Sequence, residues 1–379
     1  MRRYRWVILA AGTVTQTSFA AIYFGVAVLA PALQDRYGLS LRQLGLVLAA
    51  VNAGSLLTLL PWGLAADRFG ERFVTASGLA VASGALVVGA TTATFVPLLL
   101  ALLVAGAAAA GQNAATGRAV MHWFAREERG LALGIRQTAV PLAGAIVSLG
   151  LPHVGSVRTG LLALAAGCLA AALVAAVLLR EGVLPESEAA VPSRATLRDR
   201  RIWRLSWGSS LLLAPQICLV GFAVLFLHER RGFSPAAAAG VLAVVQLLGI
   251  AARIAAGRWS DLLGSRIVPI RLIALGLTFA VGLTAALVSA PREVLVPVLV
   301  IAGVLAMSWN GLSFTVAAET AGRARSGAAL GLQQTALAAT GALLPPAFAV
   351  LVAATSWRTG FGLVALAPLA AWSVLGRLS

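Results

Sequence analysis

Long apolar stretches alternate with short polar ones along almost the whole chain. Crossing a hydrocarbon core of about 30 Å takes an α-helix of about 20 apolar residues, and twelve stretches are close to that length. The predicted membrane-spanning helices are residues 7–33, 42–65, 74–93, 95–120, 130–152, 157–180, 202–227, 235–257, 267–289, 294–318, 327–353 and 357–376. This pattern predicts an all-α polytopic membrane protein with twelve transmembrane helices.

A hydrophilic stretch in the middle of the chain separates the first six spans from the last six. We therefore expect an N-terminal six-helix bundle at 1–180, a cytoplasmic linker at 181–201 and a C-terminal six-helix bundle at 202–379. The second part of the linker, Thr196–Arg204, is basic and could lie as an interfacial helix on an anionic leaflet. A solvated linker between two bundles explains it equally well.

Charge placement predicts the orientation in the membrane. The net charge is +16, and all 29 basic residues are arginine, which suggests nucleic-acid binding at first sight. However, the arginines fall mostly in alternate gaps between spans, which is the positive-inside distribution. We therefore expect a multi-pass protein of the plasma (inner) membrane with both termini in the cytoplasm and with no nucleic-acid partner.

One decapeptide occurs twice, half a chain apart. Gly63-Leu-Ala-Ala-Asp67-Arg68-Phe-Gly70-Glu71-Arg72 returns as Gly257-Arg-Trp-Ser-Asp261-Leu-Leu-Gly264-Ser-Arg266, and equivalent positions lie 194 residues apart. A second pair of stretches, at 129–138 and 326–335, is also alike, and Asn113 matches Asn310. Because six spans separate the copies, the two halves are expected to have parallel topology.

Twelve spans in two parallel halves, a long central loop and this paired motif resemble the major facilitator superfamily over essentially the whole chain. The resemblance implies that the motif latches neighbouring helices at the cytoplasmic face and stabilises the outward-facing state. A carboxylate beside a helix N-terminus and closely packed glycines would favour such a latch. An ordinary loop that obeys the positive-inside rule is the alternative. The expected latch residues are Gly63, Asp67, Arg68, Gly70, Arg72, Gly257, Asp261, Gly264 and Arg266.

The chain departs from the drug–proton exporters of that family. Their fourth helix carries an arginine shortly before a Gln-Gly pair, whereas this chain has Ala107 before Ala110-Gly111. Their fifth helix carries Gly-Pro and paired glycines, whereas this chain has Val140-Pro141 and Gly144-Ala145. Both differences argue against proton-driven drug export.

Side-chain amides occur in eight of the twelve predicted spans and in none of spans 3, 6, 9 and 12. An amide that faces lipid lacks partners and costs several kcal/mol, roughly, so these side chains are expected to face the interior. Taken singly, each is explained by helix–helix hydrogen bonding; as a set they favour a polar cavity. The cavity candidates, with two aromatic residues that could complete its walls, are Asn52, Asn113, Gln137, Gln216, Gln246, Asn310, Gln334, Tyr23 and Trp309.

Arg136 is the strongest candidate for contact with a solute. It lies six residues into the fifth span from Gly130, or roughly 9 Å along a helix. A charge at that depth commonly faces a cavity and serves function. Snorkelling to the cytoplasmic interface is the alternative. Arg253, nearer the end of its span, is more simply explained by snorkelling or by packing against the latch.

Several kinds of chemistry are excluded by what the spans lack. None of the 13 acidic residues lies in the middle of a span, and the three histidines lie at span ends, so no proton relay, metal site or acid–base pair is visible. The chain has no lysine, which a phosphate-binding P-loop needs. We therefore expect no enzyme activity, no cofactor and no bound metal.

The leading hypothesis is a secondary or facilitated transporter that works by alternating access, as a monomer in the lipid bilayer, on a small organic anion bound between the two halves. The anion follows from an interior with cationic and amide donors and no carboxylate. An exporter of amphipathic drugs or lipids on the same fold is the alternative. A membrane sensor that transports nothing is a third, less supported by a chain with no recognisable signalling domain.

Overall fold

The computed structural model describes residues 4–112, 115–116, 123–124, 132, 135–180, 198–321 and 326–378. Within these ranges every regular element is an α-helix or a short 3-10 helix. The described residues contain ten helical stretches long and apolar enough to cross a membrane. Two shorter helices, α4 (Phe95–Ala109) and α7 (Ala139–Gly150), fall on the fourth and fifth predicted spans. The predicted all-α membrane fold is confirmed.

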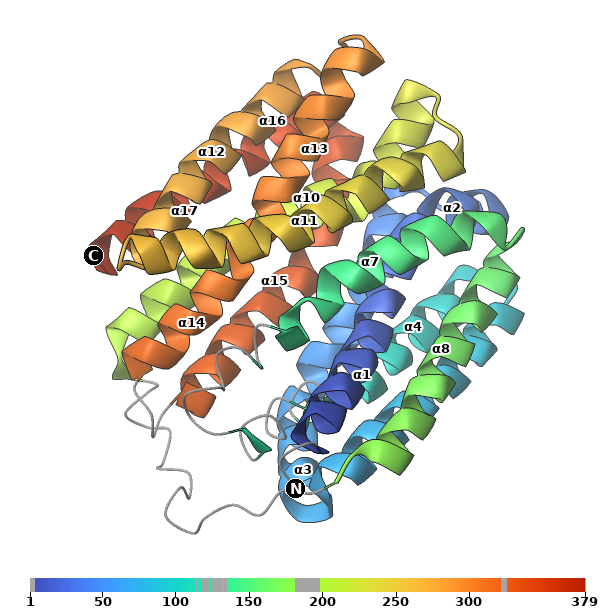
Figure 1. Cartoon of the computed structure of the whole chain (residues 1–379). Helices are drawn as coiled ribbons and strands as arrows, with labels where there is room; N and C mark the ends of the chain where they lie inside the picture. Colours follow the sequence, from blue (N-terminus) through green and yellow to red (C-terminus); the bar gives the residue numbers. More distant parts are fainter. Residues whose placement is uncertain are drawn as a thin grey trace. The chain divides into compact units, whose positions relative to one another are not determined.

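Contacts within the chain divide it into two compact units, residues 1–184 and 185–379. In the N-terminal unit, α1 packs on α7 and α8, and α3 packs on α4 and α8 (Figure 1). Besides α4 and α7, its helices are α1 (Tyr4–Val28), α2 (Ala30–Tyr37), α3 (Leu41–Thr91), η2 (Leu151–His153) and α8 (Val157–Leu178).

In the C-terminal unit, α10 packs on α15 and α17, α11 packs on α13, and α12 packs on α13 and α17 (Figure 1). Its helices are α10 (Arg200–Arg231), α11 (Pro235–Leu262), α12 (Ile267–Ala286), α13 (Arg292–Ser308), α14 (Asn310–Ala321), α15 (Ser326–Ala354), α16 (Trp357–Val364), α17 (Leu366–Leu375) and η4 (Gly376–Leu378). Of the predicted linker, only 198–201 falls in the described ranges, and its last two residues begin α10.

Several predicted spans are broken or fused where the backbone requires it. The first is divided into α1 and α2, with Pro31 in the first turn of α2, where its missing N–H is tolerated. The second and third both lie in α3, which is kinked between them at Gly70, where the backbone is not helical and the φ of 82° favours glycine. The tenth is divided into α13 and α14 at Trp309.

Glycines bring α3 and α4 together backbone to backbone. A Cβ atom on Gly106 would lie 2.1 Å from the carbonyl oxygen of Val51, and one on Gly54 would lie 2.0 Å from that of Leu103. Such close approach lets Ser55 Oγ donate a hydrogen bond across the interface to the carbonyl oxygen of Gly106, at 3.0 Å. This contact fixes α4 and, with it, the polar residues that follow.

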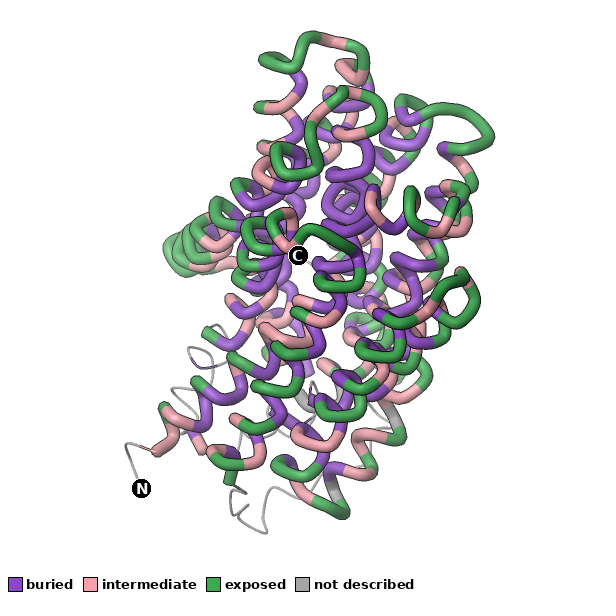
Figure 2. The backbone as a smooth tube through the Cα atoms, turned by 90° about the vertical axis from the view of Figure 1, so that its right-hand side faces the viewer, coloured by how far each residue is buried: buried purple, intermediate pink, exposed green. Residues whose placement is uncertain are grey.

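Buried and exposed positions alternate along the helices, as expected where one face of each helix packs on its neighbours (Figure 2). The C-terminal unit has an aromatic core in which the rings of Phe222, Phe348, Trp357 and Phe361 lie within 5.1–6.2 Å of one another, centroid to centroid, in the pairs that touch. These apolar surfaces hold the helices from which the polar side chains project.

Candidate functional site

A hydrogen-bonded polar cluster lies inside the N-terminal unit around Arg136. Its Nη1 donates to Gln16 Oε1 at 2.8 Å and to Thr116 Oγ1 at 3.1 Å. Gln112 Nε2 donates to the same Gln16 oxygen at 3.2 Å, and Thr116 donates back to the carbonyl oxygen of Gln112. All four side chains are buried. The cluster therefore joins α1 to the residues after α4 and before α7.

The charge of Arg136 has no carboxylate partner within the described residues, since its hydrogen bonds go to an amide and a hydroxyl oxygen. The side chain is only 7% exposed, and its Nε has no hydrogen-bond partner among the described residues. The guanidinium therefore lies inside the N-terminal unit, against neutral side chains of neighbouring segments. Burial of a charge without a counter-charge is unfavourable.

The C-terminal unit holds a neutral counterpart of this cluster. Gln333 stands where the repeat places Arg136, and Ser313 stands where it places Thr116, both 197 residues on. Gln333 Nε2 lies 2.9 Å from Ser209 Oγ and 2.6 Å from Ser313 Oγ. Ser209 belongs to α10, the first helix of its unit, as Gln16 belongs to α1. The two halves have the same polar scaffold, but only one of them carries a charge in it.

A second arginine cluster lies elsewhere in the C-terminal unit. Arg253 Nε donates to the carbonyl oxygen of Met307 at 2.7 Å, and its Nη2 donates to Asn310 Oδ1 at 3.0 Å. Asn310 Nδ2 in turn donates to Gln216 Oε1 at 3.3 Å. The side chain of Arg253 therefore joins α11 to α13 and α14 and, through Asn310, to α10.

The remaining cavity candidates have different surroundings. Gln246 and Trp309 are fully buried. Asn52, Tyr23, Gln137 and Gln334 are half-buried, and the ring of Tyr23 lies edge-to-face on Phe24. Asn113 lies outside the described residues. None of the nine span amides within those residues is exposed, in agreement with the expectation that they face the interior.

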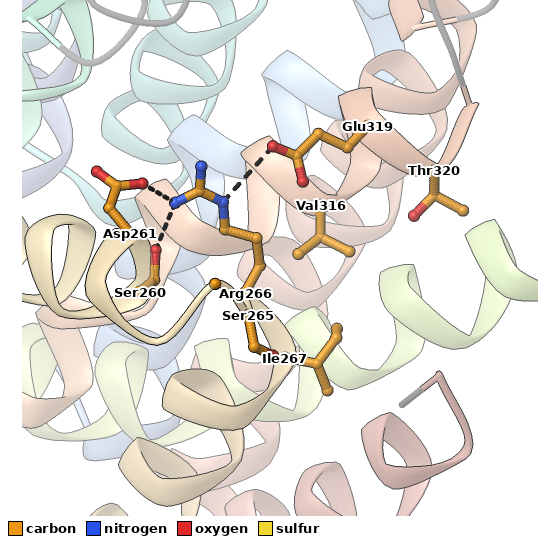
Figure 3. A pocket seen from close by; sticks show the side chains of 9 residues that line it. Ser260, Asp261, Ser265, Arg266, Ile267, Val316, Glu319 and Thr320 are labelled. Carbon is orange, nitrogen blue, oxygen red and sulfur yellow. Dashed lines mark hydrogen bonds and ion pairs between the residues drawn. The ribbon is translucent and has the colours of Figure 1, made fainter.

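The second copy of the repeated motif forms an ion-pair network at the end of α11 (Figure 3). Arg266 Nη1 donates to Asp261 Oδ1 and, at 2.6 Å, to Ser260 Oγ, while its Nε lies 3.5 Å from Glu319 Oε1 of α14. The hydrogen bond to Asp261 is the main reason that the pKa of the Arg266 guanidinium is raised. The network lines a pocket of about 500 Å³ and connects the end of α11 and the N-terminus of α12 to α14.

The first copy is described only in part, because the side chain of Asp67 lies outside what the structure describes. Arg68 and Arg72 are exposed. Gly70 and its counterpart Gly264 both have positive φ, at 82° and 60°, so each lies in a turn that favours glycine.

The first glycine of each copy has open space beside it. A Cβ atom on Gly63 or on Gly257 would meet nothing within 4 Å among the described residues. The close helix packing expected of these two glycines stays a prediction. Within the motif, the structure gives a conformational reason for Gly70 and Gly264 only.

Long apolar helices with buried polar clusters define a multi-pass membrane protein, and the repeated halves are typical of transporters. Comparison with known families agrees: the chain matches the Major Facilitator Superfamily model over residues 12–345. The chain belongs to this superfamily and is a membrane transporter whose substrate is unspecified.

Curated relatives support this assignment. A protein named as an uncharacterised MFS-type transporter of Mycobacterium tuberculosis is 37% identical over 380 residues, which cover 97% of this chain and 84% of that protein. A hexuronate transporter of Bacillus subtilis is 30% identical over 124 residues, which cover 32% of this chain and 29% of that protein.

Solved structures show the same fold. A bacterial homologue of the human lysosomal transporter Spinster, in an inward-facing and occupied conformation, matches with a TM-score of 0.79 at 18% identity, over 99% of this chain and 96% of that one. Its inward-facing, unoccupied form matches with a TM-score of 0.75. At this identity the likeness establishes the fold alone.

Proposed function

We propose that this protein is a secondary or facilitated transporter of a small organic anion, that it works by alternating access, and that Arg136 is the group that recognises the anion. The observation that carries the proposal is the buried guanidinium of Arg136, whose hydrogen bonds go to neutral oxygens only. An anionic solute would supply the missing counter-charge. Gln16 and Thr116 would hold the guanidinium in place between transport cycles.

Energetics support this assignment. A buried, uncompensated charge is unfavourable by several kcal/mol, roughly, even after the surrounding protein relaxes. An apolar residue or a glutamine would fill the same place at less cost, as Gln333 does in the other unit. The arginine at this position is explained when its charge is used during the cycle, and carboxylates are among the anions that guanidinium binds with two parallel hydrogen bonds.

The name of one relative agrees with an organic anion as substrate. Hexuronates are sugar acids, and the Bacillus subtilis protein that bears this name is similar to about a third of the chain. Coupling of transport to a solute gradient, to exchange, or to a proton carried with the anion is compatible with spans whose acidic residues all lie away from the middle.

The remaining expectations belong to the same proposal. The arginine distribution supports a cytoplasmic location for both termini. The network of Arg266, Asp261 and Glu319 supports a latch in the C-terminal unit. Asn310, Gln216, Asn52, Gln137, Gln334 and Tyr23 are proposed to contact the solute or its path.

The test is uptake of radiolabelled carboxylates into proteoliposomes. Arg136→Gln is expected to lower kcat/KM for the transported anion about 10- to 100-fold, because hydrogen bonds to charged groups contribute about 1.5–3 kcal/mol. Arg136→Lys keeps the charge but loses the planar guanidinium, so its kcat/KM is expected to lie between those of the wild type and Arg136→Gln. Arg158→Gln, which removes an exposed arginine, serves as the control with the same change in net charge.

Wild-type anion uptake by the folded Arg136→Gln protein would overturn the assignment. If the same variant also retained resistance to amphipathic drugs on overexpression, the result would favour an exporter of such compounds on this fold.

A further inference from the structure

Gln246 is a buried amide that no group among the described residues satisfies. The side chain, on α11, is 0% exposed, and neither its Nε2 nor its Oε1 has a hydrogen-bond partner. The other fully described buried amides behave differently, since Gln16, Gln112, Gln216 and Gln333 each form at least one side-chain hydrogen bond. Gln246 is thus the exception within its own class.

Leaving a buried amide without partners is unfavourable by about 1–3 kcal/mol per group. The adjacent packing is apolar: a Cβ atom on Gly303 would lie 2.7 Å from Val245 Cγ1, and one on Gly249 would lie 3.1 Å from Met307 Cβ. A methionine would fill such a place without that cost, because it is unbranched and adapts to irregular space. The packing of α11 therefore does not explain why the residue is a glutamine.

A second unsatisfied polar group lies on the segment that α11 packs against. Trp309, between α13 and α14, is fully buried, and its Nε1 has no hydrogen-bond partner. Val245, next to Gln246, lies against Gly303, and Gly249 lies against Met307, two residues before Trp309, so the two polar groups lie along the same packing surface about five residues apart. Two donors and one acceptor without partners thus belong to the surfaces along which α11 packs on α13 and α14.

The same surface also holds Arg253. It follows Gln246 by seven residues, which is about two helical turns and ~10 Å along α11, so both side chains project from nearly the same face of the helix. Arg253 is hydrogen-bonded to Met307 and Asn310. This face of α11 therefore carries two polar side chains. Arg253 has hydrogen-bond partners, whereas Gln246 has none among the described residues.

We propose that Gln246 and Trp309 form a hydroxyl-recognising subsite of the C-terminal unit, so that the transported solute is a polyhydroxylated organic acid. A hydroxyl group donates one hydrogen bond and accepts others, and neighbouring hydroxyls complement an amide that both donates and accepts. The inference rests on the proposed function for the acidic group of the solute. The hydroxyl preference stands on Gln246 and Trp309 alone.

Both groups are covered in this conformation, so the solute meets them in another state of the transport cycle. A site built to hydrogen-bond a hydroxyl rejects an analogue that lacks it far more strongly than an apolar pocket rejects an added methylene, because its polar groups are then left unpaired. Gln246 would therefore determine specificity for hydroxylated over plain acids.

Three six-carbon probes separate the two parts of the solute: gluconate carries a carboxylate and hydroxyls, hexanoate only the carboxylate, and sorbitol only hydroxyls. Binding to the purified full-length protein is measured by thermal shift and by calorimetry. The wild-type protein is expected to bind gluconate at least about tenfold more tightly than hexanoate, which corresponds to one good hydrogen bond. Gln246→Met is expected to lower gluconate affinity about tenfold and to leave hexanoate affinity unchanged.

Stability without any probe provides a further readout. Gln246→Met is expected to raise the melting temperature of the ligand-free protein, because it removes two unsatisfied groups. Gln216→Met is the matched control and is expected to lower it, since Asn310 loses its acceptor. Trp309→Phe removes the indole N–H donor and, like Gln246→Met, is expected to weaken gluconate binding.

Several results would overturn the subsite. These are equal affinity of the wild-type protein for gluconate and hexanoate, full discrimination by Gln246→Met, or binding of neither gluconate nor sorbitol. Failure of the anion proposal has a different signature: Arg136→Gln would bind gluconate as the wild type does, and sorbitol would bind as tightly as gluconate, while Gln246→Met still weakened both.

Discussion

At the scale of single residues, replacing a buried amide by methionine is expected to lower the stability at one position and to raise it at another. Gln16 accepts hydrogen bonds from both Arg136 and Gln112. Gln16→Met is expected to destabilise the protein by about 1–3 kcal/mol, because it leaves a buried charge and a buried amide without their acceptor. The same substitution at Gln246 is expected to stabilise it. Thermal melting of the two purified variants checks the contrast, and a shift in the same direction for both would contradict it.

The sequence predicted which residues are polar and interior, but it did not predict their partners. Arginine and side-chain amides are rare within the apolar spans, so their positions indicated which faces of the helices are interior. Thr116, Ser209 and Ser313 were missed because hydroxyl side chains in a helix commonly bond to their own backbone and are scattered through every span. The contacts of Arg253 with Met307 and Asn310 were not predicted, because depth along a span does not determine whether a long side chain extends to the interface or turns to a neighbouring helix.

At the scale of the helix, small residues determine how close two elements come. Gly106→Ala is expected to destabilise the protein, since the added Cβ would lie 2.1 Å from the carbonyl oxygen of Val51 and α4 would have to move away from α3. Gly84→Ala is the matched control, because a Cβ there meets nothing within 4 Å and alanine favours a helix by about 1 kcal/mol over glycine. Melting temperatures that fall for the first variant and rise or stay level for the second are the expected result.

Helix positions followed from the apolar pattern, whereas some helix breaks did not. The pattern gave one span where α13 and α14 stand, because the polar residues Ser308 and Asn310 on either side of Trp309 are too few to interrupt an apolar stretch. It correctly gave two spans within α3, which are separated by the polar motif and by the non-helical backbone of Gly70. Hydropathy shows where the chain can cross the membrane. Where a helix breaks within a span depends on side-chain packing, which hydropathy does not show.

At the scale of the whole molecule, the two halves share one arrangement of helices, but the side chains at equivalent positions have become different. Arg136 and Gln333 occupy equivalent places with equivalent hydroxyl partners, yet only one is charged. Asn52 and Gln246 are also equivalent, and one is half-buried while the other is fully covered. Because a solute is not symmetric, two halves descended from one ancestor have to become chemically different to recognise it.

The proposed latch belongs to this scale, because it is expected to act on the balance between conformations and hardly on stability. The side chains of Arg266 and Asp261 are 31% and 64% exposed, so their ion pair is expected to contribute less than about 1 kcal/mol to folding. If the pair forms in one state only, that energy still shifts the ratio of the two states several-fold. Asp261→Asn and Asp67→Asn are each expected to move the balance towards the inward-facing state.

Cysteine accessibility measures this balance. In a background with Cys168→Ala and Cys218→Ala, a cysteine introduced at Gln334 is reacted with an impermeant maleimide from either side of a vesicle. Asp261→Asn is expected to raise the labelling rate several-fold from the cytoplasmic side and to lower it from the other. High salt is expected to do the same to the protein with Asp261 intact, because screening weakens an exposed pair, and to change the Asp261→Asn protein little. Labelling that is unaffected by either change would mean that the pair is present equally in both states, which would remove its role as a latch.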